Sequence, residues 1–291
     1  MEENIVDLFE ILKVFLYGFV EGITEWLPVS STGHLIILEQ FVPLKASDEF
    51  MEMFDVVIQL GAIIAVLVLF FHKLNPWAKG KRAKEQRETI SLWFKVIIAC
   101  IPAGVIGILF DDKIDALFYN CPTIAITLIL YGVLFLLVES KKREPNITSL
   151  QNLPYSIAFA IGVAQLLALI PGTSRSGVTI IMALLLGTSR FVAAEFTFFL
   201  AIPVMFGASL IKILKFVKNC IETETGISNY ELITLGLGMI SAFLVSILAI
   251  KFLMGYIKKN NFKAFGWYRI VLGILVLLYF GIQTVLQFLA V

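Results

Sequence analysis

The segment Leu27-Pro28-Val29-Ser30-Ser31-Thr32-Gly33 breaks an apolar stretch at about residues 5–41, and Ile170-Pro171-Gly172-Thr173-Ser174-Arg175-Ser176-Gly177 breaks a second one at about 153–189. Non-helical backbone at membrane depth survives only where protein or a wet cavity satisfies its polar groups. We therefore expect two re-entrant hairpins whose tips lie near mid-membrane. A plain kinked span in each place is the alternative.

The chain as a whole has the composition of an integral membrane protein. Of its 291 residues, 59% are apolar and 15% are charged, whereas about a quarter of a soluble domain is charged. The net charge of +1 argues against a nucleic-acid partner. The sequence predicts an all-α, polytopic membrane helical bundle, residues 1–291 forming a single membrane domain. Six stretches are predicted to span, at about 51–72, 92–110, 119–139, 193–214, 231–253 and 268–290.

Basic residues are divided unevenly between the two sides of this predicted bundle. The loops at 73–95, 140–152 and 251–269 hold 15 Lys and Arg, and the connections on the other side, with an acidic turn at 111–115, hold six. Loops rich in Lys and Arg stay in the cytoplasm. We therefore expect both termini outside, the first hairpin entering from outside and the second from the cytoplasm. Met1-Glu2-Glu3-Asn4 lacks the basic start of a secretory signal.

The two halves of the chain resemble each other. A shift of 144 positions places Gly18-Phe19-Val20-Glu21 on Gly162-Val163-Ala164-Gln165, and Ser30-Ser31-Thr32-Gly33 on Ser174-Arg175-Ser176-Gly177. A hairpin and three spans make up each half, so the odd number of crossings inverts the second half. We predict an inverted repeat of 1–140 and 150–291 with a site at the midplane. Chance similarity between short Ser/Gly segments is the alternative.

Glu21 and Glu25 are predicted to share one face of a helix, because they are four residues apart. Two carboxylates in an apolar segment are costly unless they are paired, protonated or bound to a cation. A hard divalent cation, Mg²⁺ or Ca²⁺, takes oxygen ligands and would relieve both. The alternative is that Glu25 lies at the wet end of the hairpin.

Hydroxyls and an arginine follow the two proline breaks. Ser30, Ser31 and Thr32 suit the N-cap of a helix at 33–39, and Ser174 and Ser176 suit that of a helix at 177–186. Two helix N-termini that meet at mid-membrane would bind an anion. Arg175 needs an anionic partner at this depth, and its planar fork suits phosphate. An internal salt bridge to Glu21 or Glu25 is the alternative.

His34 follows the first motif directly. Its imidazole titrates near neutral pH and is suited to proton transfer beside Glu21 and Glu25. The other histidine, His72, precedes Lys73 at a predicted membrane edge.

Both motifs resemble family signatures. Glu21-Gly22-Ile23-Thr24-Glu25-Trp26-Leu27-Pro28-Val29-Ser30-Ser31-Thr32-Gly33-His34 resembles the first signature of the undecaprenyl-diphosphate phosphatase family of the bacitracin-resistance type. Pro171-Gly172-Thr173-Ser174-Arg175-Ser176-Gly177-Val178-Thr179 resembles the second, PGxSRSxxT. The resemblance covers the whole chain. It implies a helical bundle with two re-entrant helix pairs.

The resemblance also implies an activity. The family hydrolyses undecaprenyl diphosphate to undecaprenyl phosphate and inorganic phosphate, which recycles the carrier lipid of bacterial cell-wall synthesis and confers bacitracin resistance. It depends on a divalent cation, and its site opens to the outer face of the plasma membrane. A lipid-phosphate flippase would need a similar anion site and is the main alternative. The sequence leaves a homodimer open.

The expected site has three groups of residues. The catalytic residues are His34, Ser31, Glu25 and Glu21. The cation ligands are Glu21 and Glu25. The phosphate-binding residues are Arg175, Ser174, Ser176, Ser30, Thr32 and Thr179. The nucleophile is either Ser31 activated by His34, or a water activated by His34 or Glu25.

Overall fold

The computed structural model describes residues 8–118, 120–141 and 144–289, and the regular structure in these ranges is helical. The predicted all-α class is therefore confirmed. The expectations for Met1–Asn4, and those for Lys142 and Arg143 in the second basic loop, concern residues outside these ranges.

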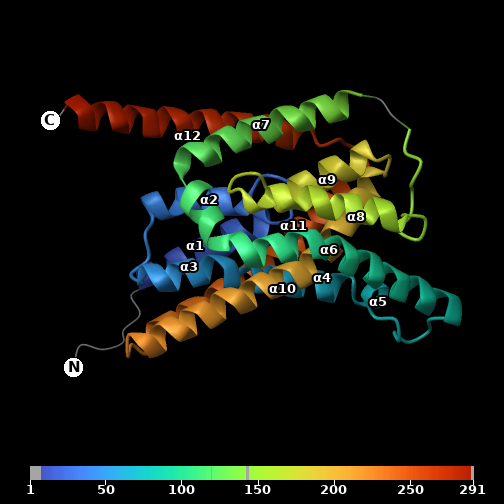
Figure 1. Ribbon diagram of the computed structural model, residues 1–291, viewed down its shortest axis with the longest axis horizontal. Helices are drawn as coiled ribbons and strands as arrows, with labels where there is room; N and C mark the ends of the chain where they lie inside the picture. Colours follow the sequence, from blue (N-terminus) through green and yellow to red (C-terminus); the bar gives the residue numbers. More distant parts are fainter. Residues whose placement is uncertain (1–7, 119, 142–143, 290–291) are drawn as a thin grey trace.

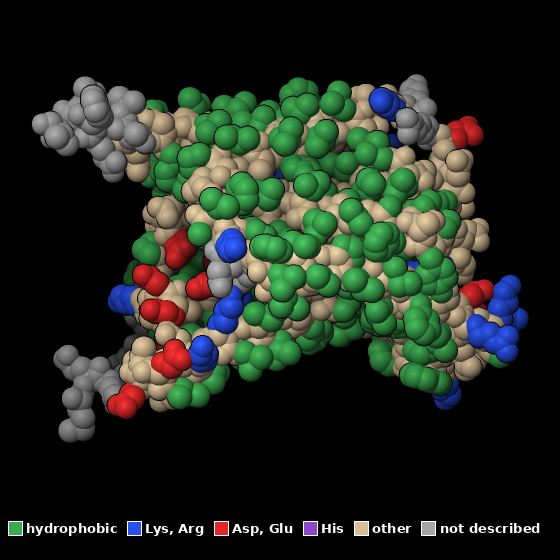
Figure 2. Space-filling view, in the orientation of Figure 1, with side chains coloured by type: hydrophobic (Ala, Val, Ile, Leu, Met, Phe, Trp, Pro, Cys, Tyr) green, Lys and Arg blue, Asp and Glu red, His purple; other side chains and the backbone are tan. Residues whose placement is uncertain are grey.

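Six helical segments are long and apolar enough to cross a membrane, which confirms a multi-pass architecture. They lie roughly parallel in Figure 1. In Figure 2 apolar side chains cover the middle of the visible face, and charged side chains gather at its two ends. The segments are α3 with α4 (Asp48–Val57 and Gln59–Leu69), α6 (Ala83–Phe118), α7 (Cys121–Ser140), α10 (Arg190–Glu222), α11 (Asn229–Tyr256) and α12 (Lys263–Leu289).

Two predicted loops are shorter than expected. Helix α6 begins at Ala83 and continues to Phe118, so the predicted acidic turn at 111–115 has helical backbone. Helices α11 and α12 leave only residues 257–262 between them. Two residues assigned to loops, Lys95 and Arg269, are instead buried inside helices. The predicted charge bias does not depend on these two residues, because the sequence has thirteen other Lys and Arg in the three loops assigned to that side.

Each polar motif separates two short helices. The first lies between α1 (Leu8–Thr24) and α2 (Ser31–Phe41), with Pro28 inside the turn at residues 25–30. The second lies between α8 (Tyr155–Ala164), with the 3₁₀ turn η1 (Gln165–Leu169), and α9 (Arg175–Leu185). Figure 1 shows α2 and α9 running in opposite directions away from the centre of the molecule. A short additional helix, α5 (Phe71–Leu74), follows α4.

The same backbone turn starts both motif helices. Ser30 and Ser174 adopt left-handed conformations, with φ of 76° and 72°. Their hydroxyls accept hydrogen bonds from the backbone N–H of Gly33 (3.4 Å) and Gly177 (3.1 Å). Both helices consequently begin directly after these caps, slightly before the predicted starts at 33 and 177.

Close helix contacts hold the motif helices in the bundle. On α1, a Cβ at Gly18 would lie 2.5 Å from the carbonyl oxygen of Gly238 on α11. On α8, a Cβ at Gly162 would lie 2.1 Å from the carbonyl oxygen of Ala99 on α6. Such small-residue contacts let membrane helices approach closely. The two motif turns are thereby fixed in the interior of the bundle.

Candidate active site

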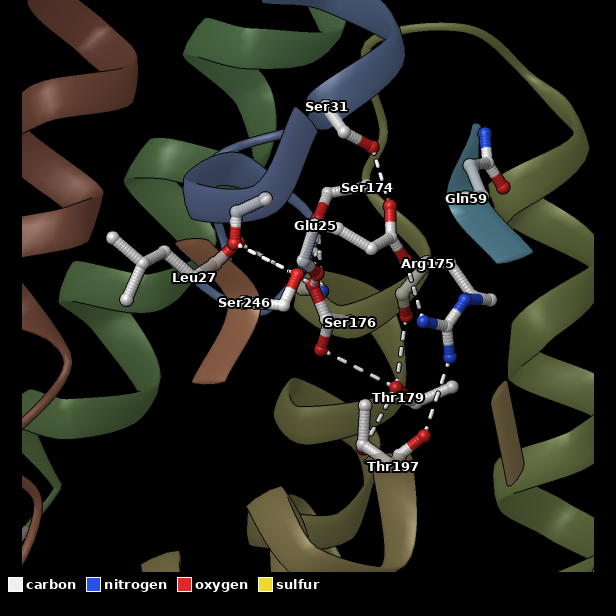
Figure 3. Close-up of polar contacts among 12 residues, drawn as sticks. Glu25, Leu27, Ser31, Gln59, Ser174, Arg175, Ser176, Thr179, Thr197 and Ser246 are labelled. Atoms are coloured by element: carbon white, nitrogen blue, oxygen red, sulfur yellow. Dashed lines mark hydrogen bonds and ion pairs between the residues drawn. The ribbon is translucent and has the colours of Figure 1, made fainter. Parts of the chain in front are cut away.

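An ion pair joins the two motifs. Nη2 of Arg175 donates to Oε1 of Glu25 at 2.6 Å, and the hydroxyl of Ser31 donates to Oε2 of the same carboxylate at 2.5 Å. Nη1 of Arg175 donates to the backbone carbonyl of Thr197 on α10 at 3.2 Å. Figure 3 shows these groups converging between the starts of α2 and α9. The sequence predicted that both motifs contribute to one site, and this geometry brings them together.

Hydroxyls of the second motif hold the turn of the first. Ser176 donates to the backbone carbonyl of Glu25 at 3.2 Å, and its hydroxyl lies 3.2 Å from that of Ser174. Thr179 donates to the Arg175 carbonyl at 2.8 Å and lies 2.9 Å from the Thr197 hydroxyl. Ser176 and Thr179 are therefore engaged in fixing the backbone around Arg175. Their hydroxyls order the site in this state.

Glu21 is a buried carboxylate without a partner. Its side chain is 0% exposed, and neither carboxylate oxygen has a hydrogen-bond partner among the described residues. Glu25, Asp55 and Arg175 lie close enough to interact with it electrostatically. Oδ1 of Asp55, on α3, is likewise buried without a partner in the described ranges. The sequence interpretation did not single out Asp55, because an isolated acid in a predicted span carries no motif.

The Glu21 carboxylate fits a bound cation, because an unpaired buried carboxylate is costly and a hard cation would relieve it. Within the described part of the chain, no group of three or more His, Cys, Asp and Glu residues has a spacing suited to a metal ion. An ion here would therefore rely on Glu21 and Glu25 for protein ligands and take its remaining oxygens from water or a bound phosphate.

His34 lies on the α12 side of the first motif. Its Nδ1 is 2.6 Å from the carbonyl oxygen of Ser30, and its Nε2 is 2.7 Å from the hydroxyl of Tyr268. The two rings are stacked, with centroids 5.7 Å apart. Among the described residues His34 has no hydrogen bond to Glu21, Glu25 or Ser31. The carboxylate of Glu25, which accepts the Ser31 hydrogen bond, is therefore the base placed next to that hydroxyl.

Thr32 lies in the first turn of α2 and is half-buried. Its hydroxyl makes no hydrogen bond to another described side chain or backbone group. Of the five predicted phosphate-binding hydroxyls, Thr32 is the one without a hydrogen bond among the described residues, whereas Ser30, Ser174, Ser176 and Thr179 are all bonded.

Arg269 connects the turns of both motifs and was missed as a site residue. Its side chain is 0% exposed. Nη1 donates to the Pro28 carbonyl at 3.2 Å, and Nη2 donates to the carbonyls of Gly172 and Thr173 at 2.8 Å each. The guanidinium also lies over the Tyr131 ring, 5.7 Å from its centroid. The sequence interpretation counted Arg269 in the basic loop at 251–269, although helix α12 already starts at Lys263.

Comparison with known proteins gives one consistent family. Residues 14–275 match the family described as bacitracin resistance protein BacA. The undecaprenyl-diphosphatase of Desulfitobacterium hafniense is 57% identical over 282 residues, which cover 96% of this chain and 99% of that protein. The undecaprenyl-diphosphatase of Lachnoclostridium phytofermentans is 58% identical over 277 residues, covering 94% and 98%. That of Enterococcus faecalis is 54% identical over 271 residues, covering 92% and 96%.

Proposed function

Because the chain belongs to the family of the bacitracin resistance protein BacA, we propose that it is an undecaprenyl-diphosphatase. It hydrolyses undecaprenyl diphosphate to undecaprenyl phosphate and inorganic phosphate, which recycles the carrier lipid for cell-wall synthesis and confers resistance to bacitracin. The observation that carries the proposal is the Glu25–Arg175 pair with Ser31 on the same carboxylate. It combines a phosphate-binding guanidinium, a hydroxyl nucleophile and a base in one buried place.

The terminal phosphoryl group binds at the meeting point of the two motif helices. Arg175 and the free backbone N–H groups at the starts of α2 and α9 stabilise the negative charge on its oxygens. Binding requires the Arg175 guanidinium to share its donors between Glu25 and the phosphate. Ser30, Ser174, Ser176 and Thr179 keep the two turns in position, and Thr32 has a hydroxyl free to reach the substrate.

Glu25 serves as the base in the reaction. In the route that its geometry supports best, Glu25 takes the proton of Ser31 and the serine oxygen bonds to the terminal phosphorus. The bond between that phosphorus and the bridging oxygen breaks, so undecaprenyl phosphate leaves with the electron pair. Water then hydrolyses the phosphoserine to inorganic phosphate. The alternative route is direct attack by a water that Glu25 or His34 deprotonates. The His34 ring is held in position by the Tyr268 hydroxyl on α12 and by the Ser30 carbonyl in the first motif.

A divalent cation, Mg²⁺ or Ca²⁺, completes the site. The unpaired carboxylate of Glu21 supports this, with Glu25 as the second protein ligand. When bound, such a cation neutralises charge on the substrate phosphates. Glu21 and Glu25 would hold this ion next to the Ser31 hydroxyl, which bonds the Glu25 carboxylate.

The two motif regions form re-entrant hairpins in an inverted repeat, with 1–140 and 150–291 as its halves. Their lengths support this: α2 and α9 have 11 residues each, or about 16 Å of helix, whereas the hydrocarbon core is about 30 Å thick. Their matching caps and the basic loops support opposite insertion.

The protein lies in the bacterial plasma membrane with its site open to the outer side and both termini outside. All of the proposed site residues come from one chain.

Phosphate release from detergent-solubilised protein tests the activity. Wild type should release inorganic phosphate from farnesyl and longer polyprenyl diphosphates, and a chelator should stop the release. A flippase would also use inverted hairpins and an anion site, but it moves its substrate without cleaving it. Binding of the lipid without release of phosphate would therefore favour the flippase and contradict the proposal.

A further inference from the structure

A cavity lies at the end of the molecule where α6 begins, away from the two motifs. Its volume is about 480 Å³. Lys and Arg side chains gather at this end in Figure 2. On the proposed topology this is the cytoplasmic side. The cavity is lined by Ala83, Lys84, Arg87, Glu88, Ser91, Lys95 and Gln151.

The lining has an excess of positive charge that the protein does not neutralise. Three of these residues are cationic and one is acidic. Lys95 is only 4% exposed, and its ammonium donates to the backbone carbonyls of Leu150 (3.0 Å) and Gln151 (3.1 Å). Within the described ranges no carboxylate lies within 4 Å of Lys95 or Arg87, and Lys84 reaches Glu88 only at 3.9 Å. A buried ammonium without an acidic partner is costly, so an anion in the cavity would be strongly favoured.

A neighbouring cavity has a lining with a different balance of charge. It has a volume of about 340 Å³ and shares Glu88 and Gln151 with the first. In this lining Lys73 forms an ion pair with the buried Glu195, and Lys81 and Glu88 are also present. Glu85 adds a further carboxylate to this lining. The excess positive charge is therefore confined to the first cavity.

Apolar side chains adjoin the first cavity on the outer surface of the bundle. On α6, Ile90 and Phe94 are 41% and 55% exposed, and both lie within one turn of cavity residues. On the adjacent α8, Tyr155 and Phe159 are also exposed, and the Tyr155 hydroxyl lies 2.9 Å from that of Ser91 in the cavity lining. In a membrane these side chains face acyl chains. A ligand of this cavity would therefore combine an anionic group with an apolar tail.

We propose that this cavity is a second lipid site, which binds the phosphate group of an anionic lipid at the membrane surface opposite the outward-facing site. Arg87 supplies a planar fork for phosphate oxygens, and Lys84 and Lys95 supply point charges. The tail lies along Ile90, Phe94 and Phe159. Two sources share this chemistry, a membrane phospholipid and a polyprenyl monophosphate. The site does not depend on the proposed hydrolysis.

Native mass spectrometry of the purified full-length protein tests the site. The protein is titrated separately with phosphatidylglycerol, polyprenyl phosphate and zwitterionic phosphatidylcholine. The variant Lys84→Gln/Arg87→Gln removes two exposed charges from the lining and leaves the buried Lys95 in place. The control Lys258→Gln/Lys259→Gln removes the same charge from exposed positions between α11 and α12 at the same end.

We expect wild type to retain at least one of the two anionic lipids in preference to phosphatidylcholine, and the one retained more strongly identifies the source. The Lys84→Gln/Arg87→Gln variant should bind it about tenfold or more weakly, because each basic residue near a membrane surface contributes substantially to binding anionic lipid. The control should bind like wild type. Equal retention of phosphatidylcholine by wild type, or an equal loss in both variants, would overturn the proposal.

Discussion

Oε1 of Glu25 and Nη2 of Arg175 are 2.6 Å apart, although the two residues are separated by 150 positions in the chain. Both side chains are largely buried. The pair therefore joins the polar motifs of the two halves in one site, and each motif contributes a different chemical group to it. A guanidinium comes from the second motif, and a carboxylate that also holds the Ser31 hydroxyl comes from the first.

Replacing Arg175 with lysine should lower kcat about 100-fold or more, because an ammonium cannot bond Glu25, the Thr197 carbonyl and a phosphate oxygen as the guanidinium fork can. Phosphate release measures the effect. Arg190→Lys is a control, since Arg190 forms an ion pair with Glu139 through two hydrogen bonds, outside the two motifs. Turnover of Arg175→Lys close to that of wild type would remove Arg175 from the mechanism.

Ser31 should become phosphorylated during turnover. Its hydroxyl already donates to the Glu25 carboxylate at 2.5 Å, so the base is in place. Acid quenching of a single turnover, followed by mass spectrometry of the Ser31 peptide, should detect one added phosphoryl group. Ser31→Ala should show neither the adduct nor turnover, whereas Ser241→Ala, which loses a buried hydroxyl outside the motifs, should show both. Full turnover in Ser31→Ala would establish direct attack by water.

Tyr268 should act through His34. Removing its hydroxyl in Tyr268→Phe leaves Nε2 of His34 without its partner. Proton transfer by His34 should then be slower, and α2 should be held less firmly. We expect Tyr268→Phe and His34→Ala each to lower kcat about tenfold, and the double variant to lose no more than His34→Ala alone. Tyr279→Phe, farther along α12, is the control. If the loss of kcat in the double variant equalled the product of the two single losses, the two residues would act separately.

Arg269 should determine stability as well as activity. Arg269→Met would leave the carbonyls of Pro28, Gly172 and Thr173 without their shared donor. Each hydrogen bond to a charged group contributes about 1.5–3 kcal/mol, so thermal unfolding in detergent should shift down by several degrees. Arg269→Lys should recover part of this loss. An unchanged Tm in Arg269→Met would mean that the turns are held by other contacts.

The sequence predicted the parts of this molecule that depend on local pattern. Long apolar runs gave the spanning helices, and proline followed by serine gave both motif turns and their caps. It missed what depends on tertiary packing. Lys95 and Arg269 were assigned to loops because charged residues normally end a span, but each is buried with backbone carbonyls as acceptors. The His34–Tyr268 contact joins residues 234 positions apart, and no local pattern indicates it.

Glu21 should be the residue through which a divalent cation stabilises the protein. Its carboxylate is fully buried and has no partner in the described chain, so ligation would remove a large unfavourable interaction. A ligand that binds only the folded state adds about 2.7 kcal/mol at 100 times its Kd, so Tm in detergent should rise when Mg²⁺ or Ca²⁺ replaces chelator. In Glu21→Gln the rise should largely disappear, while Tm in chelator stays at or above the wild-type value because an unpaired charge is gone. Glu49→Gln, at an exposed position of α3, should respond like wild type. The same cation-dependent rise in Glu21→Gln would show that the ion binds elsewhere and that the Glu21 carboxylate has another role.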